Sequence, residues 1–572
     1  MDNIKTVISR SLRPLIFIFA ACLVCIDTAN RLFIHDFSVP FVTAFLISLP
    51  TAILPGRLRI AVQLFVVEAI ILLCIIDSYC LIYLGSPISP QILPVILQSN
   101  SREAGEFFSI FIGYYVFLQW RIMLLLLLAI LFPLSYVIKV KKVKKWETVL
   151  FGLVVLLLIY DMPSTCKFFQ LFRSTKNIQV TEGFIFRHYH EAMSTPIHRL
   201  AYAWHVSKCS KQVLAEAKHS TLDAAIDSCL HISPHIILII GESYNKHHSS
   251  LYGYGLPTTP LQERRRDKGE LFVFEDVVTP WNITSNVFWE MFSLWEHGAQ
   301  ESIGTYPLFP IFFQHAGYDV NFFSNQYMTK GLRKRTTSQA GSFFLADKEL
   351  NKLLFSYRNK RADKYDMGLV KQVAEYKNNR ENPRYSLDIV HLIGQHFDYA
   401  ERYPRSYSYF TRRAYDKRPL DREAKRTVMH YDNATRYNDI VLDSLLTIYD
   451  REEAVVLFVA DHGEEVYDGL PVHGRLFQES TAIQAQQEFE IPMWIWCSEK
   501  YCDSHPEIVS HIKKSLQKPF MTDGIPQILL WLAGIKCRWT EESRNLLSPH
   551  YQCKKRIISG TTDYDSLMHF MK

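Results

Sequence analysis

The chain has 572 residues, a formal net charge of +6 and 13% aromatic side chains. This length exceeds one ordinary domain, and the mild charge is not gathered on one soluble segment, which excludes a nucleic-acid-binding surface. Much of the hydrophobicity falls in the first 160 residues, so we expect a membrane part followed by a soluble part.

Five apolar segments predict transmembrane helices, because several approach the roughly 20 residues that a helix needs to cross a bilayer. They lie at 14–29, 38–54, 60–84, 120–138 and 147–160. A signal peptide would explain only the first, which lacks a small-residue cleavage site. The shorter aromatic segment 106–119 predicts an interfacial helix.

Basic residues between the apolar segments predict the orientation of the membrane part. Three precede the first segment, Arg57 and Arg59 follow the second, and five lysines lie within 139–145. With five spans these residues share one side of the membrane, and the positive-inside rule places that side in the cytoplasm. We therefore expect the chain after Asp161 to lie outside the cytoplasmic membrane.

Alternating strand-like and helix-like runs from residue 233 onward predict an α/β fold with a largely parallel sheet. The predicted strands are 235–240, 318–324, 386–393, 455–460 and 489–496. The predicted parts of the chain are a transmembrane domain (1–162, with an outer loop 85–119), bridging helices (163–232), an α/β domain (233–556) and a C-terminal tail (557–572).

Two of the predicted strands end in side chains that can bind a metal. The first leads into Gly241-Glu242, and the fourth leads into Asp461-His462. In open α/β sheets, ligands bind beyond the carboxyl ends of the strands. Taken singly, Glu242 could cap a helix, Asp461 could make a turn and His462 could be an ordinary hydrogen-bonded histidine. Together they favour a metal site, with zinc expected ahead of manganese.

A nucleophile is expected at the start of a third element. Thr284 or Ser285 precedes the helix-like run 287–292. The N-terminus of a helix favours a phosphate, and a nearby metal can activate a hydroxyl. The alternative, a helix N-cap, is routine for Thr and Ser, and the pattern alone favours it.

Seven of the eleven cysteines lie in the polar part of the chain, so at least one of these thiols is unpaired within the chain. In an oxidising compartment, Cys497 with Cys502 and Cys537 with Cys553 could form disulfides. Ordinary buried thiols are an equal alternative.

The order of the short motifs resembles that of the membrane phosphoethanolamine transferases of bacterial envelopes, which belong to the alkaline phosphatase/sulfatase superfamily. The resemblance covers nearly the whole chain, including the five spans. The motifs are Ile-Gly-Glu-Ser (240–243), Leu-Tyr-Gly-Tyr (251–254), Thr-Thr-Pro (258–260), Asn-Ile-Thr-Ser (282–285), Ser-Asn-Gln (324–326), His-Leu-Ile-Gly-Gln-His (391–396), Arg-Tyr-Pro (402–404), Asp-His-Gly-Glu (461–464) and His-Gly (473–474).

The resemblance implies that Glu242, Thr284, Asp461 and His462 hold a zinc ion, and that Thr284 is the nucleophile. It further implies roles for four residues in substrate binding. His396 and His473 would contact the phosphate or assist proton transfer, Asn100 would lie near the donor lipid, and Lys330 would contact phosphate. The surroundings of Lys330 and the residues after Glu464 depart from the pattern of better-known members.

The implied protein has an α-helical membrane domain and an alkaline phosphatase-like α/β domain in the periplasm. It is an enzyme of the bacterial inner membrane, expected as a monomer. It transfers phosphoethanolamine from phosphatidylethanolamine to lipid A, lipopolysaccharide core or another envelope glycan. Thr284 carries the group covalently, and diacylglycerol is released.

Other functions fit the residues less well. A sulfatase needs Cys or Ser in a Cys/Ser-x-Pro-x-Arg setting, whereas Thr284 is followed by Ser-Asn-Val-Phe. A phosphoglycerol transferase or a metal-dependent phosphodiesterase of the same fold stays open. A non-catalytic lipid- or glycan-binding protein would lack a ligand or the nucleophile. A transporter would place ionisable residues within its spans. The only acidic candidates are Asp27 and Asp77, and both lie near the ends of predicted spans.

Overall fold

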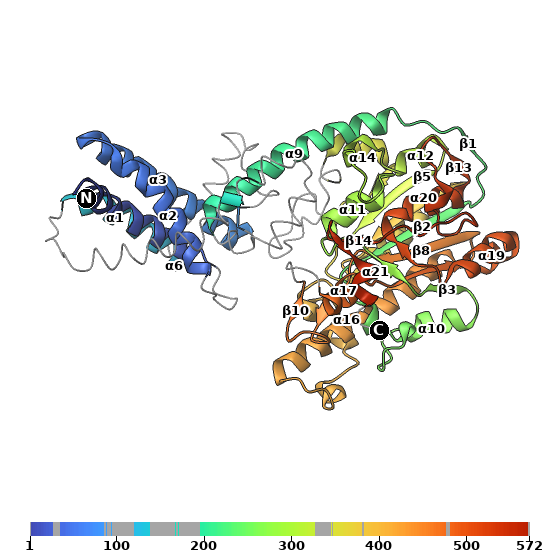
Figure 1. Ribbon diagram of the computed structural model, residues 1–572. Coiled ribbons are helices and arrows are strands. Elements are labelled where there is room, and N and C mark those ends of the chain that lie inside the picture. The colour runs from blue at the N-terminus through green and yellow to red at the C-terminus, as the bar shows by residue number, and fades with distance from the viewer. Residues whose placement is uncertain are drawn as a thin grey trace. The chain divides into compact units, whose positions relative to one another are not determined.

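The computed structural model describes residues 2–26, 35–84, 87–88, 93, 119–137, 166–167, 170, 195–326, 345, 347–379, 383–475 and 481–569. The chain divides into two compact units, 1–211 and 212–572 (Figure 1). The first is helical, and the second is built on a sheet.

Long helices pack together in the described part of the first unit. They are α1 (Asp2–Val24), α2 (His35–Ile53), α3 (Gly56–Tyr79) and α6 (Trp120–Val137). Gly56–Ile82 and Trp120–Val137 are long and apolar enough to cross a membrane, in agreement with the predicted spans 60–84 and 120–138. The predicted span 147–160 and most of the outer loop 85–119 lie outside the described residues, so the count of five stays a prediction.

Asp77, near the end of α3, has a cationic partner. Arg199 of α9 (Pro196–Leu222) donates from Nη2 to Asp77 Oδ2 at 2.5 Å and from Nε to Oδ1 at 3.0 Å, and both side chains are buried. A buried charge requires such a partner. The pair therefore gives Asp77 a structural role at the end of an apolar helix.

A seven-stranded sheet forms the centre of the second unit. Its strands, in order across the sheet, are β3 (Leu271–Phe274), β11 (Met493–Cys497), β8 (Ala454–Ala460), β2 (His235–Gly241), β7 (Ser386–His391), β5 (Asp319–Ser324) and β6 (Tyr357–Arg358). β8, β2, β7, β5 and β6 pair in parallel, whereas β11 pairs antiparallel with β8 and β3. The predicted α/β fold with a largely parallel sheet is confirmed, and the short strands β3 and β6 add to the five predicted strands.

Helices cover both faces of this sheet (Figure 1). Asp388 on β7 accepts a hydrogen bond from Tyr449, in α16 (Arg422–Tyr449), whereas His391 on the same strand contacts Phe288, in α11 (Thr284–Phe292). Since Asp388 and His391 are an odd number of residues apart, they point to opposite faces. The other helices of eight or more residues described in this unit are α10 (Pro260–Asp267), α15 (Asp366–Asn378), α19 (Pro506–Ser515) and α20 (Ile525–Ala533).

The ends of the second unit differ from the predicted domain boundaries. β1 (Ser228–Cys229) pairs with β13 (Ile535–Lys536), so the folded unit begins before residue 233. The segment 557–572, predicted as a tail, is folded in its described part: β14 (Ile557–Ile558) pairs with β15 (Thr562–Asp563), and α21 (Tyr564–His569) follows. Tyr564 is buried, which anchors this segment to the unit.

All eleven cysteines are free thiols, so neither Cys497–Cys502 nor Cys537–Cys553 forms a disulfide in this structure. Cys497 is buried on β11, and Cys502 donates from its Sγ to the carbonyl of Cys497 at 3.9 Å. The structure therefore agrees with the alternative, in which these cysteines are ordinary thiols.

Candidate metal centre

Glu242 and Asp461 follow directly on the two central strands of the sheet. β2 and β8 pair in parallel up to Gly241 and Ala460, so the next residues leave the sheet side by side. His462 Nε2 lies 3.5 Å from Glu242 Oε1 and 3.3 Å from Asp461 Oδ2. One ligand atom from each of these buried residues lies within 4.8 Å of the others. The structure thus brings three of the predicted metal ligands together.

The carboxylate of Asp461 has one satisfied and one unsatisfied oxygen. Oδ1 accepts the backbone N–H of Ser243 at 3.0 Å and that of His462 at 2.7 Å. Oδ2 is buried and has no hydrogen-bond partner among the described residues. A buried carboxylate oxygen without a donor is costly unless a cation meets it. Asp461 is therefore positioned to serve as a metal ligand.

Second contacts orient the other two candidate ligands. Nδ1–H of His462 donates to the carbonyl of Gly463 at 2.8 Å, which leaves the lone pair of Nε2 directed at the carboxylates. Glu242 accepts hydrogen bonds from Ser243 Oγ at 2.9 Å and from Gln326 Nε2 at 2.8 Å. Because these contacts fix both side chains, little reorganisation is needed to bind an ion.

Thr284 places its hydroxyl against this cluster from the first residue of α11. Its Oγ1 lies 3.2 Å from His462 Nε2 and 3.3 and 3.4 Å from the two oxygens of Glu242. Val287, Phe288 and the following apolar residues of α11 are buried, which fixes the helix under the site. Thr284, and not Ser285, therefore faces the three candidate ligands.

The electrostatics of the cluster call for a cation. Burial, together with the nearby charge of Glu242, raises the pKa of Asp461 well above its usual value. Burial also acts to raise the pKa of Glu242, but nearby positive charge, including the guanidinium of Arg475, holds it well below its usual value. Burial and the guanidinium of Arg475 lower the pKa of His462, which favours the neutral imidazole that a metal requires.

The motif 391–396 supports the backbone of Glu242. Gln395 donates from its backbone N–H to the carbonyl of Glu242 at 3.0 Å. Gly394 has a φ of 47°, and a Cβ built on it would lie 2.8 Å from the carbonyl oxygen of Glu242. Only glycine fits this left-handed, crowded position. The glycine of the motif is thus explained by its close approach to a candidate ligand.

His396 and His473 lie outside the group of candidate ligands. His396 follows the end of β7, and its Nδ1–H donates to the carbonyl of Phe397 at 2.6 Å. His473 begins β10 (His473–Gly474), and its ring stacks on Phe397 with the centroids 5.5 Å apart. Burial lowers the pKa of both histidines. Both are therefore neutral near pH 7 and available to accept a proton.

Two of the predicted substrate-binding residues, Asn100 and Lys330, lie outside the described residues.

Three residues near the cluster were not predicted as site residues. Gln326 donates to Glu242, and Arg475 Nη1 lies 3.0 Å from His462 Nε2 and donates to the carbonyl of Asn282 at 3.2 Å. Gln326 and Asn282 belong to motifs already noted, and Arg475 directly follows the His-Gly motif. Their proximity to those motifs is the signal that could have identified them.

The sulfatase family profile matches residues 234–529, which is more than half of the chain. This protein belongs to the sulfatase family. The match begins at β2 and includes every candidate ligand, so the predicted membership in the alkaline phosphatase/sulfatase superfamily is confirmed.

Curated relatives of this sulfatase-family protein include phosphoethanolamine transferases. It is 28% identical over 344 residues to phosphoethanolamine transferase EptC of Escherichia coli strain K12, which covers 58% of this chain and 57% of that relative. It is 24% identical over 548 residues to phosphoethanolamine transferase CptA of Salmonella typhimurium strain LT2, which covers 91% and 89%. The chain thus aligns with little more than half the length of EptC and with most of CptA.

Solved structures show the same fold for this sulfatase-family protein. The periplasmic domain of EptC from Escherichia coli superposes with a TM-score of 0.51 at 25% identity, covering 61% of this chain and 97% of that domain. The integral membrane protein lipooligosaccharide phosphoethanolamine transferase A from Neisseria meningitidis has a TM-score of 0.53 at 19% identity, covering 95% and 97%. The latter likeness extends over the membrane part and shows the fold alone.

Proposed function

We propose that this protein is a metal-dependent phosphoethanolamine transferase that modifies an envelope glycolipid. The observation that carries the proposal is the position of Thr284, whose hydroxyl lies 3.2 to 3.4 Å from a nitrogen and two oxygens of candidate metal ligands. The names of the curated relatives EptC and CptA support the same reaction class.

Glu242, Asp461, His462 and Thr284 would hold the metal. The unpartnered Oδ2 of Asp461 and the fixed lone pair of His462 Nε2 fit a cation, and their oxygen and nitrogen donors suit zinc ahead of manganese. A structure of the EptC periplasmic domain from Escherichia coli is a complex with Zn, which supports zinc here. When bound, the ion supplies positive charge that lowers the pKa of the hydroxyl and stabilises phosphoryl oxygens.

In the first half-reaction, Oγ1 of Thr284 forms a bond to the phosphorus of phosphatidylethanolamine, and the bond from phosphorus to the glycerol oxygen breaks. The hydroxyl proton passes to that oxygen, so diacylglycerol leaves neutral. α11 directs its N-terminus at the same position, where its backbone dipole favours the phosphate. Arg475, within 3.0 Å of His462 Nε2, adds a cationic donor for the phosphoryl oxygens.

In the second half-reaction, an acceptor hydroxyl or phosphate oxygen forms a bond to the same phosphorus, and the bond to Thr284 Oγ1 breaks. His396 and His473 are the proposed proton carriers, because burial keeps both imidazoles neutral and able to take the acceptor proton. That proton returns to Thr284, which restores the enzyme.

Because the proposed donor is a lipid, the membrane part would hold the protein at the bilayer that contains it. We propose five transmembrane helices in the bacterial inner membrane, with the second unit in the periplasm, and a monomeric protein. The likeness over 95% of the chain to an integral membrane protein supports this arrangement. Asn100, in the outer loop, would lie near the donor lipid, and Lys330 would contact phosphate. The acceptor would be lipid A, lipopolysaccharide core or another envelope glycan.

The test uses the full-length protein in detergent with lipopolysaccharide and one donor at a time. We expect phosphatidylethanolamine to yield diacylglycerol and a modified lipopolysaccharide whose mass rises by one phosphoethanolamine group. Phosphatidylglycerol is the matched control donor and should yield neither product. Turnover of phosphatidylglycerol alone would instead make the protein a phosphoglycerol transferase of the same fold.

A further inference from the structure

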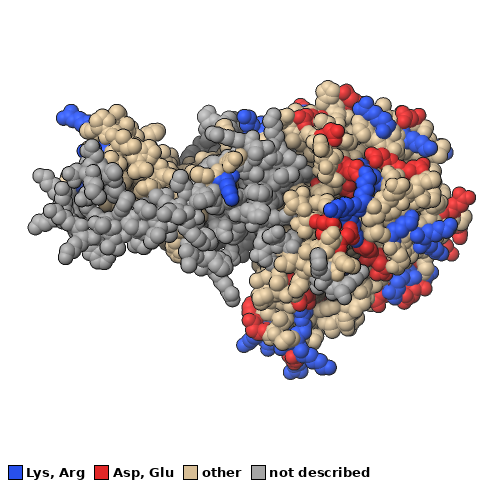
Figure 2. Space-filling model, in the orientation of Figure 1, with Lys and Arg blue, Asp and Glu red and all other residues tan. Residues whose placement is uncertain are grey.

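A basic segment, residues 402–418, projects from the second unit. It holds six cationic side chains and one acidic side chain, Asp416. Figure 1 shows the orange chain before α16 projecting at the lower edge of this unit, and Figure 2 shows blue side chains at the same end. Four of the cations are exposed and have no ion-pair partner within the described residues: Arg405, Arg412, Arg413 and Lys417.

Exposed aromatic rings accompany these cations. Tyr407 and Tyr409 in the basic segment are 45% and 58% exposed, and Phe397, just before it, is 56% exposed. The rings are held in place, because Tyr407 packs edge-on against Tyr437 and the guanidinium of Arg436 lies 4.6 Å from the ring centroid of Tyr409. The surface therefore presents ordered aromatic faces among free cations.

Beneath this surface lies a separate apolar cluster. It is formed by Tyr399, Phe410, Tyr415, Val428, Tyr431 and Val466. Val466 belongs to β9 (Glu465–Val466), which pairs with β10 and thus with His473. The basic segment, the N-terminal half of α16 and the hairpin that carries His473 therefore share one core.

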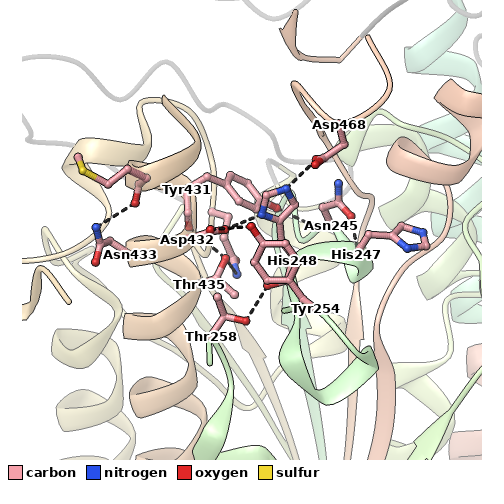
Figure 3. A network of polar contacts seen from close by, with 12 residues as sticks. Asn245, His247, His248, Tyr254, Thr258, Tyr431, Asp432, Asn433, Thr435 and Asp468 are labelled. Atoms are coloured by element: carbon pink, nitrogen blue, oxygen red, sulfur yellow. Dashed lines mark hydrogen bonds and ion pairs between the residues drawn. The ribbon is translucent and has the colours of Figure 1, made fainter. Parts of the chain in front are cut away.

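A buried polar network around His248, Asp432 and Asp468 (Figure 3) also holds the end of the basic segment. His248 is fully buried between two carboxylates, with its Nδ1 2.5 Å from Asp432 Oδ1 and its Nε2 2.7 Å from Asp468 Oδ2. Arg418 donates to Asp468 at 2.8 Å, and Tyr415 donates to Asp432 at 2.6 Å. Since Asp468 lies in the turn between β9 and β10, these contacts bind the basic segment to the hairpin.

The network should make stability depend on pH. Burial opposes the charge of His248, but Asp468 and Asp432 outweigh it and raise its pKa from about 6.5 to about 10. Tyr254 and Arg418 also face the network, donating to Asp432 and Asp468. Because the pKa of His248 is higher in the folded than in the unfolded protein, its ion pairs stabilise the fold fully below about pH 6.5. This contribution to the free energy of unfolding is lost as the pH rises towards 10.

We therefore expect His248→Gln to lower the unfolding temperature most near pH 6 and progressively less towards pH 10. Thermal unfolding of the full chain and of the variant across this pH range measures the difference. A difference that stays constant with pH would contradict a charged His248.

We propose that the basic segment and Phe397 form the binding surface for the acceptor, a glycan that carries phosphate groups. This proposal rests on the proposed function, since it names the second substrate of the same site. Arginine forks pair with phosphate oxygens, and tyrosine faces offer apolar area to the carbon-hydrogen faces of sugar rings. Phe397 links the basic segment to the proposed proton carriers, because it follows His396 in the chain and stacks on His473.

Charge and composition favour a phosphorylated glycan over a bilayer surface. On this surface the exposed large hydrophobic residues are Phe397, Tyr407 and Tyr409, and there is no exposed Leu, Ile, Met or Trp to enter a membrane. The unpaired cations instead call for an anionic partner.

The experiment separates the two half-reactions in the full-length protein in detergent. Loading is followed as the phosphoethanolamine adduct on Thr284 after addition of phosphatidylethanolamine. Discharge is followed after addition of phosphorylated lipopolysaccharide core oligosaccharide, or of the same oligosaccharide treated with phosphatase. The variant is Arg412→Glu/Arg413→Glu, and the matched control is Lys348→Glu/Lys352→Glu, two exposed lysines on α14 (Lys348–Leu354).

We expect the arginine variant to load at the wild-type rate and to discharge to the phosphorylated oligosaccharide about tenfold more slowly or worse. With the phosphatase-treated oligosaccharide, the adduct on Thr284 should be lost at the same rate in wild type and in the arginine variant. The lysine control should match wild type in the rates of both steps. Added salt should slow wild-type discharge more than that of the variant.

Equal discharge by wild type and the arginine variant would overturn the proposal. Slower loading of the variant from phosphatidylethanolamine in nanodiscs, with normal discharge, would overturn it in favour of a membrane contact. If wild type forms no adduct on Thr284, the proposed function fails. Direct titration with the phosphorylated oligosaccharide then tests whether the basic segment and Phe397 bind it. Tighter binding by wild type than by the variant would then uphold the surface, and equal binding would overturn it.

Discussion

Replacing Thr284 with alanine is expected to abolish transfer. The substitution removes the only oxygen that α11 places within 3.4 Å of Glu242 and His462 among the described residues, and with it the proposed covalent carrier. Loss of a nucleophile lowers turnover by about 10⁴-fold or more. Release of diacylglycerol from phosphatidylethanolamine in detergent, followed with time, measures the effect.

Thr284→Ser is the matched control, because it keeps an oxygen at the same position. We expect serine to retain part of the activity, within about 100-fold of wild type, since the same neighbours can activate its hydroxyl. Thermal unfolding of both variants should stay close to wild type, so that lost activity does not reflect lost folding. Undiminished transfer by Thr284→Ala would place the nucleophile elsewhere.

Replacing Asp461 with asparagine should have opposite effects on stability with and without metal. In the metal-free protein, Asp461 Oδ2 is a buried oxygen without a donor beside Glu242, and an amide nitrogen in its place can donate. Relieving such a group stabilises by about 1–3 kcal/mol. In the metal-loaded protein, the same change removes a ligand and weakens the binding that stabilises the fold.

Thermal unfolding with zinc and with a chelator, together with metal content by mass spectrometry, measures both effects. We expect Asp461→Asn to unfold at a higher temperature than wild type in chelator and at a lower one in zinc. Glu464→Gln is the control, since Glu464 is also buried but lies outside the ligand group. A destabilising effect of Asp461→Asn in both conditions would mean that the carboxylate serves the fold instead of a metal.

Glu242 and Asp461 could be predicted because each follows directly on a central strand, and His462 follows Asp461. β2 and β8 are neighbours that pair in parallel up to Gly241 and Ala460, so Glu242 and Asp461 leave the same edge of the sheet side by side. Thr284 is different, because its position depends on the packing of α11 beneath the sheet. The sequence pattern left Thr284 and Ser285 open, and only the family resemblance singled out Thr284.

Gln326 and Arg475 show what local patterns miss. Each reaches the cluster from a different segment, and only tertiary packing brings Gln326 to Glu242 and Arg475 to His462. The strands β3 and β6 are short, so their sequence carries little periodicity. The same holds for the two-residue strands that fold residues 557–563 onto the unit.

Under the proposed function, Thr284 carries phosphoethanolamine in a metal-dependent step. The most direct test is mass analysis of the intact protein and its peptides after incubation with phosphatidylethanolamine in detergent, with and without a chelator. We predict a phosphoethanolamine adduct on the peptide that contains Thr284, absent from the chelated protein and from Thr284→Ala. A zinc-loaded protein that releases diacylglycerol while forming no adduct at Thr284, even when rapidly quenched, would rule out Thr284 as the covalent carrier.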